Sequence, residues 1–317
     1  IPTEQITGTI DRAIEIFTEL GDEWGLYRSW SLLAWIRLGG GRAREAQMAA
    51  SRAATHARSA GDTSAEMWCL WRGLNAAVLG PTPVNEGVAM SRHVFERVKG
   101  HPAHEASVSS MRALLEAMSG DVEAARAAIA HARLLFQELG NTHGLAGMTN
   151  AASDVELYAG DLVAAERERR SGYEAHRSVG AEAYQATSAA CLADILVQLG
   201  RDDEALEFAQ EGEELSVEGD ISAQVPSRFA KAKVLARRGE SHQAGRLARE
   251  AVSIAEGTDW LNLQGDAQMA LAEVLRLAGR SNEAADAAKQ AAERYERKGN
   301  VVAAGWAREL LLELGAG

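Results

Sequence analysis

The stretch from Ala181 to Gly219 decides the fold, and it reads AEAYQATSAACLADILVQLGRDDEALEFAQEGEELSVEG. Two segments of about eighteen residues lie within it, separated by Gly200 and closed by Gly219. In both segments apolar side chains recur every three or four residues, which is the spacing of a helix with one buried face. A glycine just past a helix can adopt the left-handed conformation that closes the last turn. The stretch therefore predicts two antiparallel helices joined by a very short turn.

Glycines at the same spacing divide the rest of the chain. Two series, offset by about twenty residues, each advance in steps of 38 to 42 residues. Their members are Gly21, Gly61, Gly100, Gly140, Gly180, Gly219, Gly257 and Gly299, and Gly41, Gly80, Gly120, Gly160, Gly200, Gly239 and Gly279. N-cap residues follow seven of these glycines, namely Asp22, Asp62, Asp121, Asn141, Asp161, Asp220 and Asn300. Self-similarity at a fixed period of this size predicts a solenoid of stacked repeats.

We therefore expect an all-α, right-handed superhelical solenoid that occupies residues 1–317 as one repeat domain. It should contain about seven antiparallel helix pairs with a repeat of about 40 residues, flanked by helices around residues 4–20 and 300–314. Only the second pair looks distorted, because Gly80-Pro81-Thr82-Pro83 lengthens its turn. The chain begins at Ile1 and is helical in pattern almost at once, so we expect a fragment of a longer multidomain protein.

Three repeats carry the residues of a known motif. Leu192-Ala193, Gly200 and Glu204-Ala205 recur as Leu271-Ala272, Gly279 and Glu283-Ala284, and again as Leu33-Ala34, Gly41 and Glu45-Ala46. The chain resembles the tetratricopeptide repeat in this pattern, although its repeat exceeds the family's 34 residues and the family's closing proline is absent. The tail YERKGNVVAAGWAR, residues 295–308, is similar to the C-terminal helical regions of large bacterial regulators. These are of the ATPase, LuxR or cyclase-linked type.

The composition limits the classes of partner. The net charge of −12 at pH 7 opposes binding to phosphate backbones, so we expect no direct contact with nucleic acid. No apolar run is long enough to cross a membrane. Two cysteines, Cys69 and Cys191, and the lack of a signal peptide favour a cytoplasmic location. The run Arg167, Arg169 and Arg170, interleaved with glutamates, is expected to be a solvated helix face.

No motif of catalysis or of cofactor binding is present. The sequence lacks a P-loop, a nucleophile elbow and a His-Glu-x-x-His pair. His101 and His104, three residues apart, could share a helix face and bind zinc. They lie in the first turn of a predicted helix, where we expect ordinary solvent-facing residues. The sequence thus predicts no cofactor, no metal and no enzymatic activity.

The first helix of each pair should line the concave side, as the resemblance implies. The position six residues before each turn glycine, with members of the position four residues earlier, gives a candidate groove. Its residues are Trp35, Leu74, Leu114, Asn150, Asp154, Asp194, Phe229, Lys233 and Glu273. The early apolar members are either ordinary core or the apolar end of a groove for an amphipathic peptide. Because unpaired buried charges are costly, we expect Asp154, Asp194, Lys233 and Glu273 to be exposed.

Tryptophan is concentrated near the start of the chain. Five of the seven residues, Trp24, Trp30, Trp35, Trp68 and Trp71, precede residue 72. They could fill the core or form a docking surface. We expect an interaction or autoregulatory module of a signalling or transcriptional regulator, binding a peptide or a partner domain in the groove. That partner could be an upstream ATPase or cyclase domain of the same chain. The alternative is a sensor of a small-molecule effector.

Overall fold

The computed structural model describes residues 3–217 and 219–315, and within these ranges the chain is helical without any strand. In chain order the helices are α1 (Thr3–Leu20), α2 (Glu23–Gly39), α3 (Ala43–Ser59), α4 (Thr63–Leu79), α5 (Val84–Val98), α6 (Pro102–Met118), α7 (Val122–Glu138), α8 (Thr142–Tyr158), α9 (Leu162–Ser178), α10 (Glu182–Gln198), α11 (Asp202–Leu215), α12 (Ile221–Arg237), α13 (Ser241–Glu256), α14 (Leu261–Leu277), α15 (Ser281–Lys298) and α16 (Val301–Glu313). The prediction of seven pairs, α2/α3 to α14/α15, with a helix on either side is confirmed.

The turns between helices have the predicted chemistry almost everywhere. All predicted turn glycines have positive φ except Gly80 and Gly257, for which the prediction is wrong. Gly80 is extended (φ −86°, ψ −162°) because Pro81-Thr82-Pro83 still separate it from α5. Gly257 is helical (φ −68°, ψ −6°), and the chain runs on through Trp260 before α14 starts. The predicted caps that accept a backbone N–H are Asp22, Asp62, Asp121, Asn141, Asp161 and Asn300.

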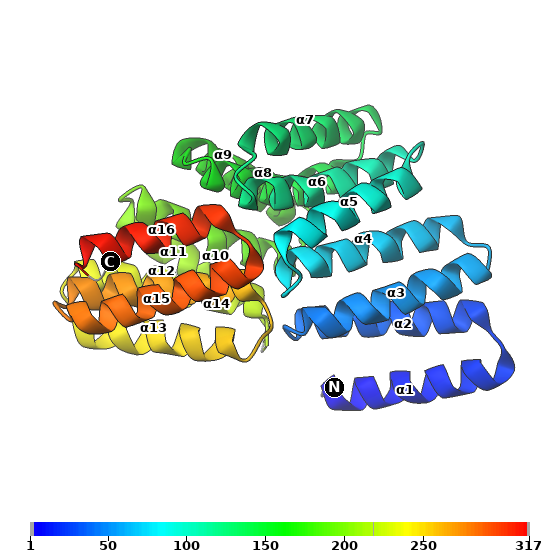
Figure 1. Cartoon of the computed structure of the whole chain (residues 1–317), viewed down its shortest axis with the longest axis horizontal. Coiled ribbons are helices and arrows are strands. Elements are labelled where there is room, and N and C mark those ends of the chain that lie inside the picture. The colour runs from blue at the N-terminus through cyan, green and yellow to red at the C-terminus, as the bar shows by residue number, and fades with distance from the viewer. Residues whose placement is uncertain (1–2, 218, 316–317) are drawn as a thin grey trace.

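The helices form an inner and an outer layer (Figure 1). Successive even-numbered helices pack on one another in the runs α4–α6–α8 and α10–α12–α14, whereas no two odd-numbered helices make a comparable contact in the described chain. A stack with one crowded and one spread layer curves toward the crowded side. The even-numbered helices therefore line the inner, concave face. At the N-terminal end this layer loosens, since α2 and α4 barely touch.

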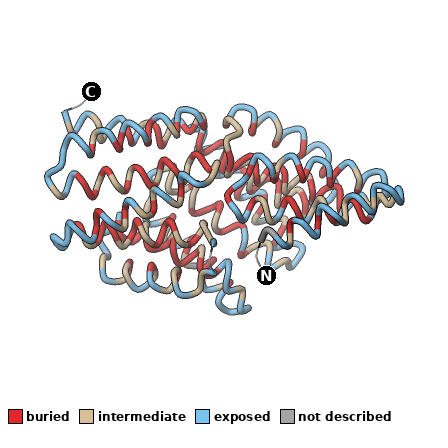
Figure 2. The backbone as a smooth tube through the Cα atoms, turned by 90° about the horizontal axis from the view of Figure 1, so that it is seen from below, coloured by how far each residue is buried: buried red, intermediate tan, exposed pale blue. Residues whose placement is uncertain are grey.

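The core runs along the whole stack as small clusters between neighbouring helices. Figure 2 shows buried residues on the sides where helices face one another and exposed residues on the outward sides. Alanine dominates many clusters, which lets helices approach closely. Glycine does the same at Gly144 of α8, where an added Cβ would lie 2.4 Å from the ring of Phe136 in α7.

The two ends of the stack meet, which the repeat pattern did not predict. In Figure 1 the turns beside α14 and α15 lie against the ends of α3 and α4. We call this contact the seam. Its residues on the C-terminal side are Thr258, Asp259, Trp260, Asn262, Lys298 and Val301, and on the N-terminal side Leu38, Gly41, Ala43, Arg44, Ala77, Gly80, Thr82, Met118 and Gly120.

Hydrogen bonds between distant residues fasten the seam. The carboxylate of Asp259 accepts from the backbone N–H groups of Ala43 (2.7 Å) and Arg44 (2.9 Å), and so caps α3. The N-cap residue of α3 itself, Arg42, makes no side-chain cap bond. The Asp259 N–H donates to the carbonyl oxygen of Gly41 at 2.9 Å. The superhelix is thus closed between its C-terminal and N-terminal pairs.

Candidate functional site

The inner face exposes a group of aromatic and cationic side chains at its N-terminal end. We call Trp24, Arg28 and Trp35 of α2 with Trp68 and Arg72 of α4 the tryptophan surface. Trp24, Trp35 and Trp68 are 53%, 51% and 44% exposed. On α2 the three residues are four and seven apart, which places them on one side of the helix. The predicted groove residue Trp35 therefore lies at the surface with two further tryptophans that the groove prediction did not include.

The arginines hold this surface together. The guanidinium of Arg28 lies over the ring of Trp24 at 4.8 Å from its centroid, and that of Arg72 lies over Trp35 at 5.4 Å. Arg72 also donates through Nη1 to the carbonyl oxygen of Ser31 at 3.1 Å, and so links α4 to α2. Such cation–π contacts favour one orientation of ring and guanidinium. The sequence carried a signal for the first contact only, because Trp24 and Arg28 are four residues apart on one helix. Arg72 contacts Trp35 of another helix, which no local spacing indicated.

Three predicted groove residues are part of the core instead. Leu74 is fully buried and Leu114 is 8% exposed, both in the cluster that spans α4 to α8. Phe229 is also buried, beneath the ammonium of Lys233 at 5.2 Å. The interpretation of the early leucines as core is the one that the structure supports. The helices α2 and α4 begin 40 residues apart, so Gly80 corresponds to Gly40 and not to the turn glycine Gly41. Counting back from Gly80 therefore gives Leu74, one residue before the position that matches Trp35.

The predicted charged residues form an ion-pair chain between neighbouring inner helices. Lys233 Nζ of α12 lies 2.7 Å from Asp194 of α10 and 3.8 Å from Glu273 of α14. Burial by itself would lower the pKa of Lys233, but the two carboxylates raise it. The expectation of exposure is wrong for Lys233, which is buried. The two carboxylates compensate the charge of Lys233, so the lysine can be buried here and does not line an open groove.

Asp154 and Asn150 hold an arginine from the outer layer. Arg169 of α9 is buried, and its guanidinium contacts the carboxylate of Asp154 and the Asn150 side-chain oxygen, the latter at 2.9 Å. The expectation of a solvated arginine run is thus wrong for Arg169, while Arg170 pairs with Glu166 at 2.7 Å as expected. Since Asp154 neutralises a buried cation, it has a structural role beside any role in binding.

A further carboxylate, Asp266 of α14, belongs to this part of the inner face and was not predicted. Burial raises the pKa of Asp266 to about 7, although the hydroxyl of Tyr295, which donates to it at 2.6 Å, opposes the rise. The negative charges of Asp194 and Asp154 raise it further. This part of the inner face therefore holds three carboxylates, of which Asp154 and Asp194 are paired with Arg169 and Lys233.

The last helix contacts this part of the inner face. Tyr158 of α8 stacks on Trp306 of α16, with ring centroids 5.7 Å apart and planes 14° from parallel. The side-chain amide of Asn300 donates to the Tyr158 hydroxyl at 3.1 Å. These contacts join α8 directly to the C-terminal end of the stack.

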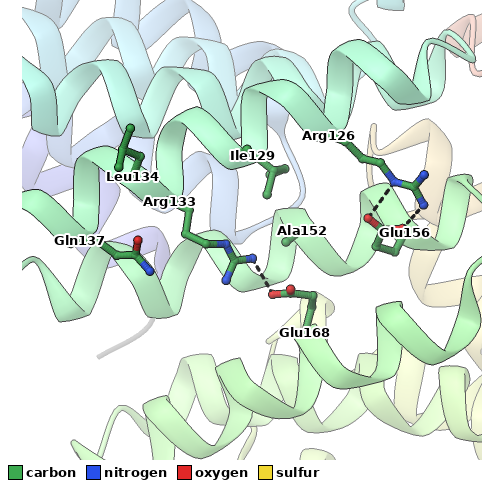
Figure 3. A pocket seen from close by; sticks show the side chains of 9 residues that line it. Arg126, Ile129, Arg133, Leu134, Gln137, Ala152, Glu156 and Glu168 are labelled. Atoms are coloured by element: carbon green, nitrogen blue, oxygen red, sulfur yellow. Dashed lines mark hydrogen bonds and ion pairs between the residues drawn. The ribbon is translucent and has the colours of Figure 1, made fainter.

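The outer side carries a shallow groove between α7, α8 and α9 (Figure 3). Its volume is about 370 Å³, and Ile129 and Ala152 contribute apolar lining. Two ion pairs border it: Arg126 with Glu156, and Arg133 with Glu168 at 2.9 Å. None of the predicted groove residues lines it.

The described chain offers no cluster of three or more histidine, cysteine or acidic side chains that could hold a metal. His104, expected to face solvent, is buried and packs edge-on to Trp68 at 4.9 Å between centroids. Burial lowers the pKa of His104. No helix among the described residues is both long enough and apolar enough to cross a membrane.

Solved structures share this architecture. Aspartyl phosphate phosphatase F from Bacillus subtilis is similar with a TM-score of 0.64 and 12% identity, over 90% of this chain and 75% of that chain. NprR in complex with its cognate peptide NprX gives 0.58 and 13%, over 98% and 85%. A Signal Transduction ATPase with Numerous Domains protein with a tetratricopeptide repeat sensor, from Pyrococcus horikoshii, gives 0.59 and 10%, over 97% of this chain. This chain spans 53% of that ATPase protein. No family model and no curated protein sequence matches the chain.

The described residues form sixteen helices, fourteen of them in seven antiparallel pairs. They superpose over nearly the whole chain on a protein that is described as having a tetratricopeptide repeat sensor, and this likeness decides the fold. It is a tetratricopeptide-like repeat fold. The predicted fold class is confirmed, despite the longer repeat and the missing proline. At 10–13% identity the likeness shows the tetratricopeptide-like fold and nothing of what this chain binds.

Proposed function

We propose that the chain is a protein-interaction module of a regulator, which binds a peptide or a segment of a partner domain on its inner face. The observation that carries this proposal is the tryptophan surface, where three tryptophan rings of the inner layer are about half exposed. Large exposed apolar side chains that cluster on one face of a protein are typical of interaction sites. Tryptophan and arginine are also the residues most enriched in the energetic centres of interfaces.

The likeness to known proteins supports the same kind of function. NprR is described with its cognate peptide, and the ATPase protein is described as carrying a repeat sensor. Both are statements about those proteins. They support a chain that recognises a peptide or partner and passes the event to a neighbouring domain, such as an ATPase or a cyclase. No arrangement of side chains described above suggests catalysis, so we propose a non-enzymatic role.

Binding of a small-molecule effector is the second candidate. The outer groove of about 370 Å³ between α7 and α9 favours it, since ligand sites begin at about 300 Å³. Its floor is apolar, but the arginines that border it are already paired with glutamates. We therefore rank peptide or protein binding on the inner face first.

Selection from a random peptide library on the immobilised chain tests the proposal. For a selected peptide, Trp35→Ala should raise the dissociation constant by about tenfold or more, as expected for a hot-spot tryptophan. Leu134→Ala is the matched control, because Leu134 is 53% exposed but lies on the outer side in α7. The melting temperature should stay unchanged in both variants. Peptides that bind Trp35→Ala as they bind the unaltered chain would contradict the proposal.

A further inference from the structure

Two arginines of the tryptophan surface have no acidic partner in the described chain. Most arginines of this protein are paired: Arg58 and Arg97 share Glu66, and Arg112 contacts Glu116. No carboxylate lies within ion-pair distance of Arg28 or of Arg72 among the described residues. A guanidinium has five N–H donors, and Arg72 uses one of them, on the Ser31 carbonyl. Donors suited to carboxylates therefore remain free beside exposed tryptophan rings.

The segment from α2 to α4 carries a charge opposite to that of the whole chain. Residues 23–79 contain seven arginines, no lysine and four acidic residues, which gives a net charge of +3. The full chain has a net charge of −12. The segment from α2 to α4 is thus a basic region within an acidic protein. A potential of this kind attracts and orients acidic partners.

The inner face beyond α4 offers such a partner fewer free cations. Asp154, Asp194 and Asp266 lie on α8, α10 and α14. Only Arg169 and Lys233 directly pair with two of these carboxylates. Arg169 and Lys233 are therefore not free to bind the carboxylates of an acidic segment, whereas Arg28 and Arg72 are.

We propose that the tryptophan surface binds an acidic amphipathic segment of a partner protein. Its apolar side chains would pack on Trp24, Trp35 and Trp68, and its carboxylates would pair with Arg28 and Arg72. The stacking of each guanidinium on a ring leaves its N–H edge free, and bidentate contact with a carboxylate uses that edge. This inference rests on the proposed function and specifies the chemistry of the partner.

The test uses two synthetic peptides with fluorescent labels. Both have 18 residues and place leucine on one helix face, with glutamate on the other face in the first peptide and lysine in the second. Fluorescence anisotropy with the full chain should show binding of the Glu/Leu peptide, and the affinity should fall as salt is raised. Arg28→Glu combined with Arg72→Glu should weaken this binding by about tenfold or more.

A charge-matched variant serves as control. Arg92→Glu combined with Arg167→Glu makes the same change in net charge on α5 and α9, where both arginines are exposed and unpaired in the described chain. This control should bind the Glu/Leu peptide with nearly unchanged affinity. Equal loss in both double variants would mean that only net charge matters and would overturn the proposal.

Three other outcomes overturn it as well. One is tight binding of the Lys/Leu peptide that Trp35→Ala abolishes; the inner face would then bind peptides, as proposed above, but not acidic ones. Another is that neither designed peptide binds, while binding of library peptides is still weakened by Trp35→Ala. The inner face would then still bind peptides, but acidic segments would not be its partners. The third is that the unaltered chain self-associates in analytical ultracentrifugation and the double variant Arg28→Glu, Arg72→Glu does not. The tryptophan surface would then bind a second copy of the chain.

Discussion

The ammonium of Lys298 donates to the carbonyl oxygen of Gly80 at 2.7 Å, across 218 residues of chain. It also donates to the carbonyl oxygens of Ala77 (2.7 Å) and Thr82 (2.8 Å). Carbonyls at the end of a helix lack partners within that helix, and a cation there is favoured by the helix dipole. Lys298 therefore completes the C-terminus of α4 from the last residue of α15, and it is fully buried in doing so.

Replacing Lys298 should destabilise the protein strongly. Lys298→Met keeps the apolar stem but leaves three carbonyl oxygens at the seam without their donor. We expect a loss of about 3 kcal/mol in the free energy of unfolding, measured by urea denaturation. Lys289→Met is the control, since Lys289 is exposed on the same helix and should change stability by less than about 0.5 kcal/mol. Equal effects of the two variants would show that the seam does not contribute to stability.

Asp194 should be needed for stability, contrary to the expectation from the sequence. Asp194→Ala leaves buried Lys233 with only Glu273, at 3.8 Å, and we expect a cost of about 3 kcal/mol in urea denaturation. Adding Lys233→Met should restore part of the loss, because the uncompensated charge is then removed. Asp286→Ala, at an exposed position of α15, is the control and should be nearly neutral. A neutral Asp194→Ala would mean that Lys233 is solvated.

Asp266 should make stability depend on pH between its unfolded and folded pKa values. Burial raises its pKa from the ordinary 3.8 to about 7, so the folded protein binds more protons than the unfolded chain across that interval. The stabilisation of the folded state by protonated Asp266 is fully present below about pH 4, and it is lost as the pH rises through about 7. Asp266→Asn keeps an acceptor for Tyr295 but cannot ionise. Its stability relative to the unaltered chain should therefore increase from pH 4 to 7 in urea denaturation, and a constant difference would refute the assignment.

Two glycines of α8 should respond oppositely to the same substitution. Gly144→Ala places a Cβ 2.4 Å from the Phe136 ring, so α7 and α8 must separate, and we expect a loss of about 1–3 kcal/mol. Gly147→Ala meets nothing within 4 Å and should stabilise the helix by up to about 1 kcal/mol. Comparison of the melting temperatures of the two variants separates the effect of packing on stability from the effect of helix propensity. Equal shifts of the two melting temperatures would be inconsistent with the close contact.

The local elements were predictable because each is defined by residues close in sequence. Gly200 ends α10 with φ +74°, and Asp161 caps α9, as their positions beside helical segments indicated. The exceptions, Gly80 and Gly257, adjoin segments that depart from the repeat: the proline-containing turn, and the extra residues before α14. The groove prediction assumed a constant period and ignored such departures. It therefore placed Leu74 on the inner face, although Leu74 is buried.

The candidate site was less predictable because burial and pairing depend on residues far apart in sequence. The tryptophans were recognised as a possible surface, but the sequence could not separate Trp35, which is exposed, from Trp71, which is partly buried. Charge alone likewise suggested that Lys233 faces water, whereas Asp194, 39 residues away, allows its burial. The seam left no local signal, since Asp259 and Lys298 are ordinary residues until the fold brings them to α3 and α4.

The seam also determines how many repeats this chain can contain. An open solenoid tolerates gain or loss of a repeat, since each unit meets only its neighbours. Here Lys298 reaches α4 only because a fixed number of helix pairs, each rotated relative to the one before, lies between α4 and α15. Duplicating or deleting one 40-residue unit, such as α10 and α11, would carry Lys298 past Gly80 and leave Asp259 away from α3. The length of this array is therefore restricted by geometry, and its evolution should proceed by substitution within repeats rather than by change in their number.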